Sequence, residues 1–171
     1  VINFINESQC IAAVIDGLGH GKEANMASQL ARQTIIQKSE LPVDILMQSI
    51  HQSIRGTRGT TIGLVSIDTA FEKISFSGIG NIESFLINNN EKKNLLSFGG
   101  IMGHNMRTPR VFEFPFKVGD FVFMYSDGIT SRWKPEELDW TQHPQKLTDL
   151  ILNQFARSND DATVLIIGHT A

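Results

Sequence analysis

Short apolar segments separated by short turns fill the middle of the chain, and they limit the folds open to it. After the RGTRG stretch at 55–59, such segments follow one another at 60–68, 73–78, 81–88 and 94–98. Short runs of this composition, bounded by Gly, Asp and Asn, are typical of β-strands. Because strands joined by turns this short pair in the antiparallel sense, we expect antiparallel sheet here.

Helical patterns come as one early pair and one late element, not after every strand. Apolar or small residues recur at helical spacing in 22–39, again after Pro42 (Val43, Leu46, Met47, Ile50, Ile54), and in 144–156. Further strands are predicted at 10–15, 110–116, 121–127 and 162–168. This order predicts an α+β fold, two packed antiparallel sheets with helices outside, and not a doubly wound parallel sheet. At 171 residues, 41% of them hydrophobic, the chain is expected to form a single domain over 1–171.

Composition excludes several function classes. With 15 basic and 18 acidic residues, the net charge of −3 argues against a nucleic-acid-binding face. The single cysteine cannot form an internal disulfide, which fits a reducing compartment. No apolar run approaches about 18 residues, and no signal-peptide pattern is present. We therefore expect a cytoplasmic protein that binds neither nucleic acid nor membranes.

Three predicted strands carry an acid at one end. IAAVIDGLGHGKEA (11–24) places Asp16 before Gly17, FVFMYSDG (121–128) places Asp127 before a glycine, and SNDDATVLII (158–167) has Asp160 and Asp161 before the apolar run. Clustered carboxylates raise one another's pKa unless a cation compensates, and Mg²⁺ or Mn²⁺ suits oxygen ligands. A glycine after the acid lets the backbone carbonyl face the same ion. Asp-Gly is also a common turn, and spacing alone leaves both readings open.

Other motif readings fail on inspection. Gly21-Lys22 is followed by Glu23, which rules out a P-loop, and Lys22 stands where a dinucleotide fingerprint needs glycine. The histidines show no zinc-ligand spacing, and the G-x-S-x-G elbow of serine hydrolases is absent.

The three acidic motifs, in this order, resemble a known family. DGLGHGKEA (16–24), SDGI (126–129) and NDDATVLI (159–166) are similar to motifs of the PPM family of metal-dependent serine/threonine phosphatases. They are closest to its bacterial SpoIIE-like branch and, within it, to the small RsbX-like phosphatases. RGTRGTTIGLVSID, FSGIGNIESFLI and GGIMG lie between them in the expected order, so the resemblance covers about 11–168.

This resemblance implies a fold and a metal site. The fold would be an αββα sandwich of two antiparallel β-sheets flanked by helix pairs. Two Mn²⁺ or Mg²⁺ ions would lie at one end, bridged by Asp16, with the Gly17 carbonyl on one ion. Asp127 and Asp160 would bind the other ion, with Asp161 replacing Asp160 if the register shifts by one. No protein nucleophile would be needed, because water shared by two such ions becomes acidic enough to attack phosphorus.

The sequence departs from the family at three points. A further metal-binding Asp, one strand upstream, has no counterpart: Glu7 is the only earlier acid, and it sits in an apparent hairpin turn. We expect that acid to lie before Val1, with the first strand cut near its start. Leu18 replaces the His that follows Asp-Gly in eukaryotic-type members, and His20 is either an acid catalyst or an exposed loop residue. Asn81 stands where some relatives have an acid that binds a further metal.

Substrate contacts are left open by the sequence. Arg107 and Arg110 could meet phosphate or an acidic partner, or could be ordinary surface charges. Arg58 matches a family motif, and a structural role near Thr60 and Thr61 is equally compatible. The segment with Trp133 and Trp140 predicts either rings packed on the core or a partner-docking flap.

The expected activity is hydrolysis of phosphoserine or phosphothreonine in a phosphorylated protein. By analogy with RsbX-like enzymes, the partners would be STAS-domain antagonists or stressosome scaffolds of a bacterial stress-response partner-switching circuit. Two alternatives stay open: a catalytically impaired phosphatase-like binding module, and a metal-dependent phosphatase of small phosphate esters.

Overall fold

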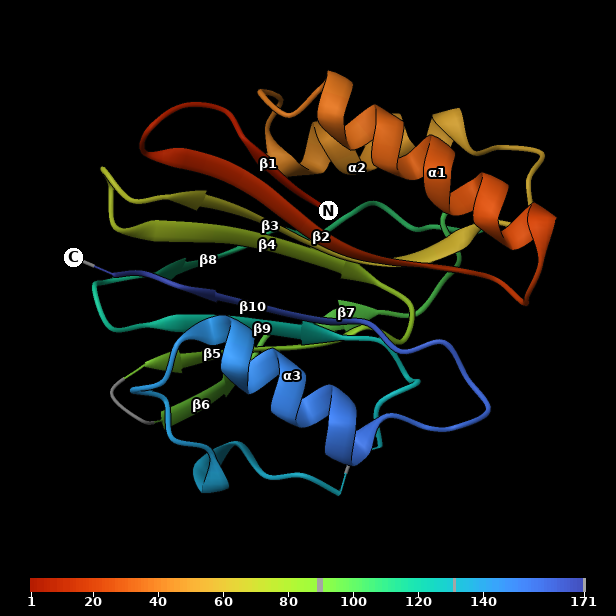
Figure 1. Ribbon diagram of the computed structural model, residues 1–171. Helices are drawn as coiled ribbons and strands as arrows, with labels where there is room; N and C mark the ends of the chain where they lie inside the picture. The colour runs from red at the N-terminus through yellow and green to blue at the C-terminus, as the bar shows by residue number, and fades with distance from the viewer. Residues whose placement is uncertain (89–90, 131, 171) are drawn as a thin grey trace.

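The computed structural model describes residues 1–88, 91–130 and 132–170, and it shows two β-sheets stacked face to face with helices outside (Figure 1). Sheet A has the strand order β1-β2-β3-β4-β7, with β8 also paired to β4. Its strands are β1 (Ile2–Phe4), β2 (Gln9–Gly17), β3 (Thr60–Asp68), β4 (Lys73–Ile79), β7 (Ser97–Phe98) and β8 (Phe112–Pro115). Sheet B has the order β10-β9-β5-β6, built from β5 (Glu83–Asn88), β6 (Glu91–Asn94), β9 (Phe121–Tyr125) and β10 (Val164–Gly168).

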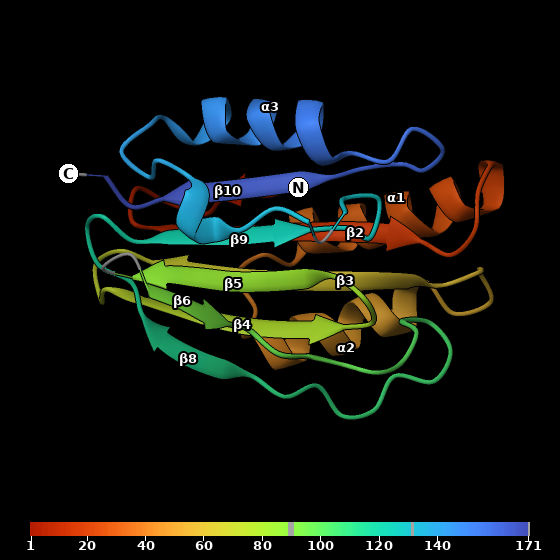
Figure 2. The same ribbon diagram turned by 90° about the horizontal axis from the view of Figure 1, so that it is seen from below.

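The helices cover the outer faces of the sheets. α1 (Lys22–Gln37) and α2 (Val43–Ser53) lie on sheet A, and α3 (Pro144–Phe155) runs alongside β10 of sheet B (Figure 2). Pro42 precedes α2 and Pro144 opens α3, positions that suit the fixed φ of proline. The α+β sandwich is therefore confirmed. In the described residues, the helix cover of sheet B consists of α3 and the 3-10 turn η1 (Pro135–Glu137), where the resemblance implied a helix pair.

Three apolar clusters follow from the period-2 alternation of the strands. In β2, Cys10, Ala12 and Val14 face the space between the sheets, whereas Ile11 and Ala13 pack under α1 and α2. Burial on both faces explains why this strand reads as a continuous apolar run. The third cluster packs α3 on sheet B.

The stretch 94–98, predicted as one strand, is divided between the two sheets. Asn94 ends β6 in sheet B, whereas Ser97 and Phe98 form β7 in sheet A. One strand cannot serve both sheets, so the chain crosses between them at 95–96. Because β7 arrives from the other sheet and not through a hairpin turn, it pairs with β4 in the parallel sense, an exception to the predicted antiparallel pattern.

The two tryptophans pack on the core. Trp133 is buried against Phe85, Phe123 and Tyr125, and the Trp140 ring lies 5.3 Å from that of Phe121. The indole N–H of Trp140 donates to the Pro135 carbonyl at 2.9 Å. These rings therefore belong to the α3 layer, the first of the two predicted alternatives. Across the described residues, no helix combines the length and hydrophobicity needed to cross a lipid bilayer.

Candidate metal centre

Asp16 and Gly17 lie at the end of β2, where the strand passes beneath the first turn of α1. They pair with Thr61 and Thr60 of β3. A Cβ on Gly17 would collide with the Ala24 carbonyl, so only glycine lets the strand approach the helix this closely. The glycine after Asp16 thus has a packing role, and the binding of an ion by its carbonyl stays a prediction.

Asp127 and Asp160 are brought together by contacts between the segments that follow β9 and precede β10. The Ser126 N–H donates to the Thr163 carbonyl at 3.1 Å, and the Thr163 N–H donates to the Ser126 hydroxyl at 3.0 Å. A Cβ on Gly128 would collide with the backbone of Asp161. Gly128 therefore allows the two acidic segments to lie against each other.

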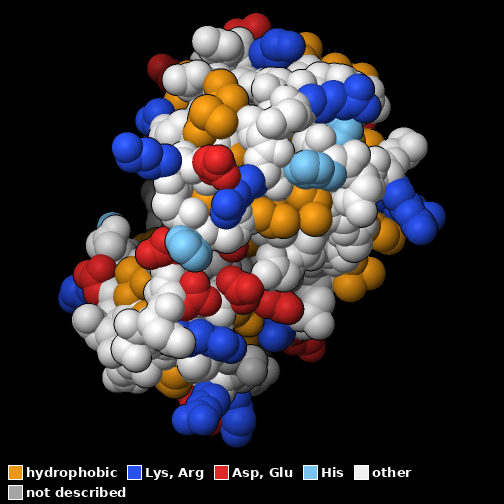
Figure 3. Space-filling model, turned by 90° about the vertical axis from the view of Figure 1, so that its right-hand side faces the viewer, with side chains coloured by type: hydrophobic (Ala, Val, Ile, Leu, Met, Phe, Trp, Pro, Cys, Tyr) orange, Lys and Arg blue, Asp and Glu red, His pale blue; other side chains and the backbone are white. Residues whose placement is uncertain are grey.

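One cleft of about 670 Å³ gathers the four acids found at the ends of the predicted strands. Asp16 lies in sheet A, whereas Asp127, Asp160 and Asp161 lie in the segments that follow β9 and precede β10 of sheet B, so the cleft spans the gap between the sheets. His20, Thr61 and Asn81 line it as well. Figure 3, which shows this end of the molecule, has a cluster of acidic side chains near its centre.

The cluster is electrostatically strained. Partial burial, followed by the charges of Asp127, Asp160 and Asp161, raises the pKa of Asp16 to about 6 from its ordinary value of 3.8. The Asn81 amide donates to Asp127 Oδ2 at 2.6 Å, and the Asp161 N–H donates to Asp160 Oδ1 at 3.0 Å. These two bonds orient the carboxylates without neutralising them.

The donor chemistry fits Mg²⁺ or Mn²⁺, although the side chains do not complete a coordination shell. Carboxylate and carbonyl oxygens are the ligands that these ions prefer, and a cation would relieve the repulsion at Asp16. Within 1–88, 91–130 and 132–170, no three Asp, Glu, His or Cys side chains come close enough to hold a metal ion. A divalent ion here would thus need further ligands, from water, backbone or additional chain.

Two residues of the cleft were missed as site residues by sequence reasoning. The Thr61 hydroxyl, next to Asp16 across the strand pair, is buried and has no hydrogen-bond partner. Asn81 was noted only for the acid that it replaces, and the structure shows it bonded to Asp127. The β3 register, once known, would have indicated Thr61, because it places residue 61 opposite residue 16.

The basic residues considered from the sequence do not share one location. Arg58 binds Glu23 at 2.6 Å, which ties the loop before β3 to the start of α1. The Arg110 guanidinium lies over the Phe98 ring at 5.0 Å, and Arg107 lines a separate groove beside α2. His20 is exposed at the cleft. Glu7 is exposed in the turn between β1 and β2 and does not line the cleft.

Comparison with known proteins identifies the family to which the chain is similar. The Stage II sporulation protein E (SpoIIE) family matches residues 6–170. The phosphoserine phosphatase RsbX of Bacillus subtilis (strain 168) is 19% identical over 162 residues, which are 94% of this chain and 81% of RsbX.

Solved structures agree with the sequence comparison. A chain from work on the bacterial stressosome, described as a modular system adapted to control secondary messenger signalling, superposes with a TM-score of 0.89 at 26% identity. The alignment covers 97% of this chain and 88% of that one. A crystal structure of RsbX in complex with magnesium superposes with a TM-score of 0.87 at 20% identity, covering 98% and 84% of the two chains.

Proposed function

We propose that this chain, which belongs to the SpoIIE family of PPM-type phosphatases, is a metal-dependent phosphatase that acts on phosphoserine or phosphothreonine in proteins. The observation that carries this proposal is the cleft in which acids from both sheets meet at one end of the sandwich. RsbX, the phosphoserine phosphatase to which the chain is similar over 94% of its length, supports the reaction type.

The metal ligands would be distributed over the two sheets. Asp16 would bridge two divalent ions, and the Gly17 carbonyl would complete one of them. Asp127 and Asp160 would hold the other ion, with Asp161 as the alternative to Asp160. When bound, two such ions lower the pKa of a shared water and offset negative charge on the phosphoryl oxygens.

The remaining residues of the cleft would hold this arrangement in place. Asn81 fixes one oxygen of Asp127 through its 2.6 Å hydrogen bond, which leaves the other oxygen free to bind. Gly128 keeps the Asp127 turn against Asp161. Thr61 pairs with Asp16 across β2 and β3 and lines the cleft, and its buried hydroxyl has no hydrogen-bond partner.

A protein substrate suits the cleft better than a small ester. Asp127, Asp160 and Asp161 are all exposed, so the acids stand at an open surface and not in an enclosed pocket. Enclosure of most of the ligand is the usual property of small-molecule sites. The likeness to a stressosome chain supports a phosphorylated STAS-domain or stressosome protein as the substrate.

The register of β1 indicates where the missing ligand would lie. Ile2 pairs with Ala12, and Val1 and Ala13 exchange backbone hydrogen bonds at 2.8 and 2.9 Å. Continued in this register, a residue three positions before Val1 would stand opposite Asp16. We propose that position for the upstream acid.

The test is phosphate release from a phosphoserine peptide with Mn²⁺ or Mg²⁺, compared with the same reaction in EDTA. Asp127→Asn should reduce the metal-dependent rate by at least about a hundredfold, the usual scale for loss of an electrostatic catalytic group. Asp139→Asn, which alters an exposed carboxylate that does not line the cleft, serves as the matched control. Metal-independent release, or equal rates for the two variants, would refute the proposal.

A binding module is the second candidate, and one observation favours it. The acids that line the cleft do not complete a metal shell in the described part of the chain. An N-terminally extended protein carrying an acid three positions before Val1 separates the two cases. Hydrolysis by the extended protein identifies a phosphatase. If neither this chain nor the extended protein hydrolyses the peptide and both still bind a phosphoprotein, the chain is a binding module.

A further inference from the structure

A groove of about 780 Å³ along the outer side of α2 is lined by cations and by no carboxylate. Lys38 comes from the end of α1, Arg55 from the loop after α2, and Arg107 from the loop before β8. All three side chains are exposed, and none forms an ion pair in the described residues. The chain has more acidic than basic residues, so its overall charge does not account for a groove that is lined by cations and by no carboxylate.

Other side chains of the lining can donate hydrogen bonds to carboxylates. Four of them are neutral and polar: Gln48, Ser49, Gln52 and Thr108. Ile45, 42% exposed, adds an apolar contact. Cations flanked by neutral donors form the setting in which acidic side chains are recognised.

Two loops connect this groove with the metal cleft. The loop between α2 and β3 includes Arg55, which lines the groove, and ends at Gly59, whose carbonyl accepts from the Leu18 N–H of the cleft at 3.1 Å. Four residues span at most about 14 Å, so the backbone of Arg55 lies within about 14 Å of this contact with the cleft. In Figure 3, blue and pale-blue side chains lie above and to the right of the acidic cluster, on the same end of the molecule.

The surroundings of the groove exclude a long polyanion. Pro109 lines both this groove and a second cavity of about 820 Å³, where Glu40, Asp44, Asp68 and Glu113 outnumber Lys73. The loop that carries Arg55 leads from the groove to the acidic cleft, where Gly59 contacts Leu18. Nucleic acid or an anionic membrane needs a broad basic face, whereas a short acidic peptide fits between two acidic borders.

We propose that the groove lined by Lys38, Arg55 and Arg107 docks an acidic segment of the phosphoprotein substrate, close to the phosphorylated residue. This inference rests on the proposed phosphatase function for its catalytic consequence. The docking step itself is a binding event that does not depend on metal or on turnover.

Binding is therefore measured first, by fluorescence anisotropy in EDTA. The probe is a labelled peptide with serine at the reactive position and a short Asp/Glu run a few residues away, compared with the same peptide carrying Asn/Gln. The protein should bind the acidic peptide at least about threefold more tightly, the lower bound for three exposed ion pairs. High salt should remove the difference.

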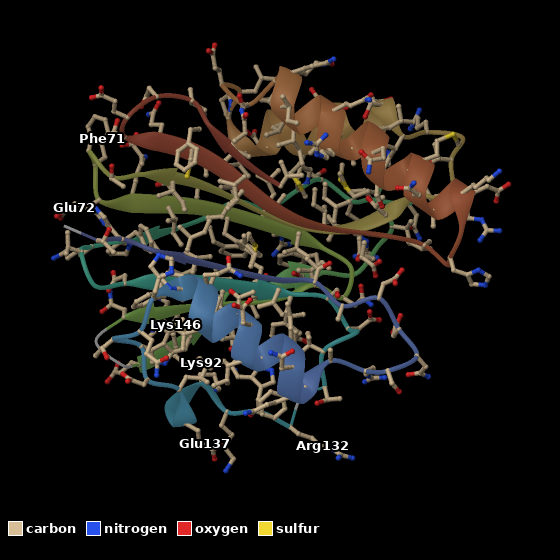
Figure 4. The ribbon with its side chains drawn as sticks, in the orientation of Figure 1. Phe71, Glu72, Lys92, Arg132, Glu137 and Lys146 are labelled. Carbon is tan, nitrogen blue, oxygen red and sulfur yellow. The ribbon has the colours of Figure 1, made fainter. Side chains whose placement is uncertain are left out.

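Charge reversal locates the site. Lys38→Glu, Arg55→Glu and Arg107→Glu, combined, should abolish the preference for the acidic peptide. The control combines Lys92→Glu, Lys117→Glu and Lys146→Glu, which changes net charge equally on exposed residues outside the groove; Figure 4 shows Lys92 and Lys146 on the sheet B side. The control should bind as the unchanged protein does. Equal loss in both, or no preference in the unchanged protein, would overturn the proposal.

Kinetics then separate docking from catalysis. The combined Lys38→Glu, Arg55→Glu and Arg107→Glu variant should show a KM for the phosphorylated acidic peptide that is at least about threefold higher. Its kcat and its hydrolysis of p-nitrophenyl phosphate should be unchanged. Absence of metal-dependent hydrolysis of every substrate by both this chain and the N-terminally extended form, with the anisotropy difference intact, would refute the phosphatase function and keep the docking site. A doubled mass in solution that groove reversal returns to the monomer would instead assign the groove to a second copy and overturn the proposal.

Discussion

Replacing Asp16 with asparagine should make the metal-free protein more stable at neutral pH while it removes metal-dependent activity. Asparagine has the same size but carries no charge. Asp16 is half-buried and close to Asp127, Asp160 and Asp161, and these causes together raise its pKa to about 6. The carboxylate that we propose as a metal ligand therefore destabilises the metal-free fold.

The sign and size of the effect follow from this pKa. Because the folded-state value lies above the ordinary 3.8, the folded chain holds the proton more tightly than the unfolded chain. The free energy of unfolding thus falls as pH rises from about 4 to about 6, and the loss is complete above that window. The difference between 3.8 and about 6 corresponds to about 3 kcal/mol, and because solvent screens a half-buried carboxylate, asparagine should recover about 1–3 kcal/mol of it.

Thermal unfolding in EDTA, followed by circular dichroism, measures this gain. In a chain of this size, 1 kcal/mol moves Tm by about 2–4 °C, so Asp16→Asn should melt higher by about 2–12 °C at neutral pH and by almost nothing near pH 4. Asp139→Asn is the control, because hydrogen bonds from Thr141 and Gln142 lower the pKa of that exposed carboxyl. An asparagine variant at position 16 that is less stable at neutral pH, or that gains equally at both pH values, would refute the reasoning.

Three further results are expected. Gly128→Ala should lower the free energy of unfolding by about 2 kcal/mol, as overpacking does, and reduce metal affinity, because its Cβ collides with the Asp161 backbone; chemical denaturation and metal titration check this. Arg58→Ala should lower the free energy of unfolding by less than about 1 kcal/mol, because its pair with Glu23 is solvent-exposed; a larger loss in urea unfolding would contradict a weak, solvent-screened pair. Tyr125 is the only tyrosine, and burial raises its pKa to about 12, so tyrosinate absorbance should stay low until well above pH 10 in the folded protein, and stability should fall between about pH 10 and 12. Titration at the unperturbed pKa in the folded state would show that the ring is not buried.

The sequence predicts those parts of the fold that depend on local patterns. The strand at 60–68 and the helix that opens at Pro144 lie where periodicity and proline position indicate. The crossing at 95–96 is different, because Leu95 and Leu96 are both apolar and only the second is exposed. Long-range strand pairing decides which sheet the residues before and after this dipeptide join, and sequence periodicity carries no information about that pairing.

The candidate site divides in the same way. Asp16 and Asp127 were recognisable because each ends an apolar run, and the structure places both in one cleft. Their proximity depends on how the two sheets stack, which spacing does not encode. Thr61 and the bond from Asn81 to Asp127 could not be predicted, because both arise from tertiary contacts between residues far apart in the sequence.

The division of the acids between two sheets has a mechanical consequence. In the described strands, no hydrogen-bonded ladder joins sheet A to sheet B, so side-chain packing and the connecting loops hold the layers together. Repulsion between Asp16 on one layer and Asp127 on the other pushes this end of the sandwich apart. A cation bound between them would cross-link the layers and slow amide hydrogen exchange at the ends of β2, β9 and β10 together. The metal concentration would then set how often the sandwich opens at the end that holds the acidic cleft.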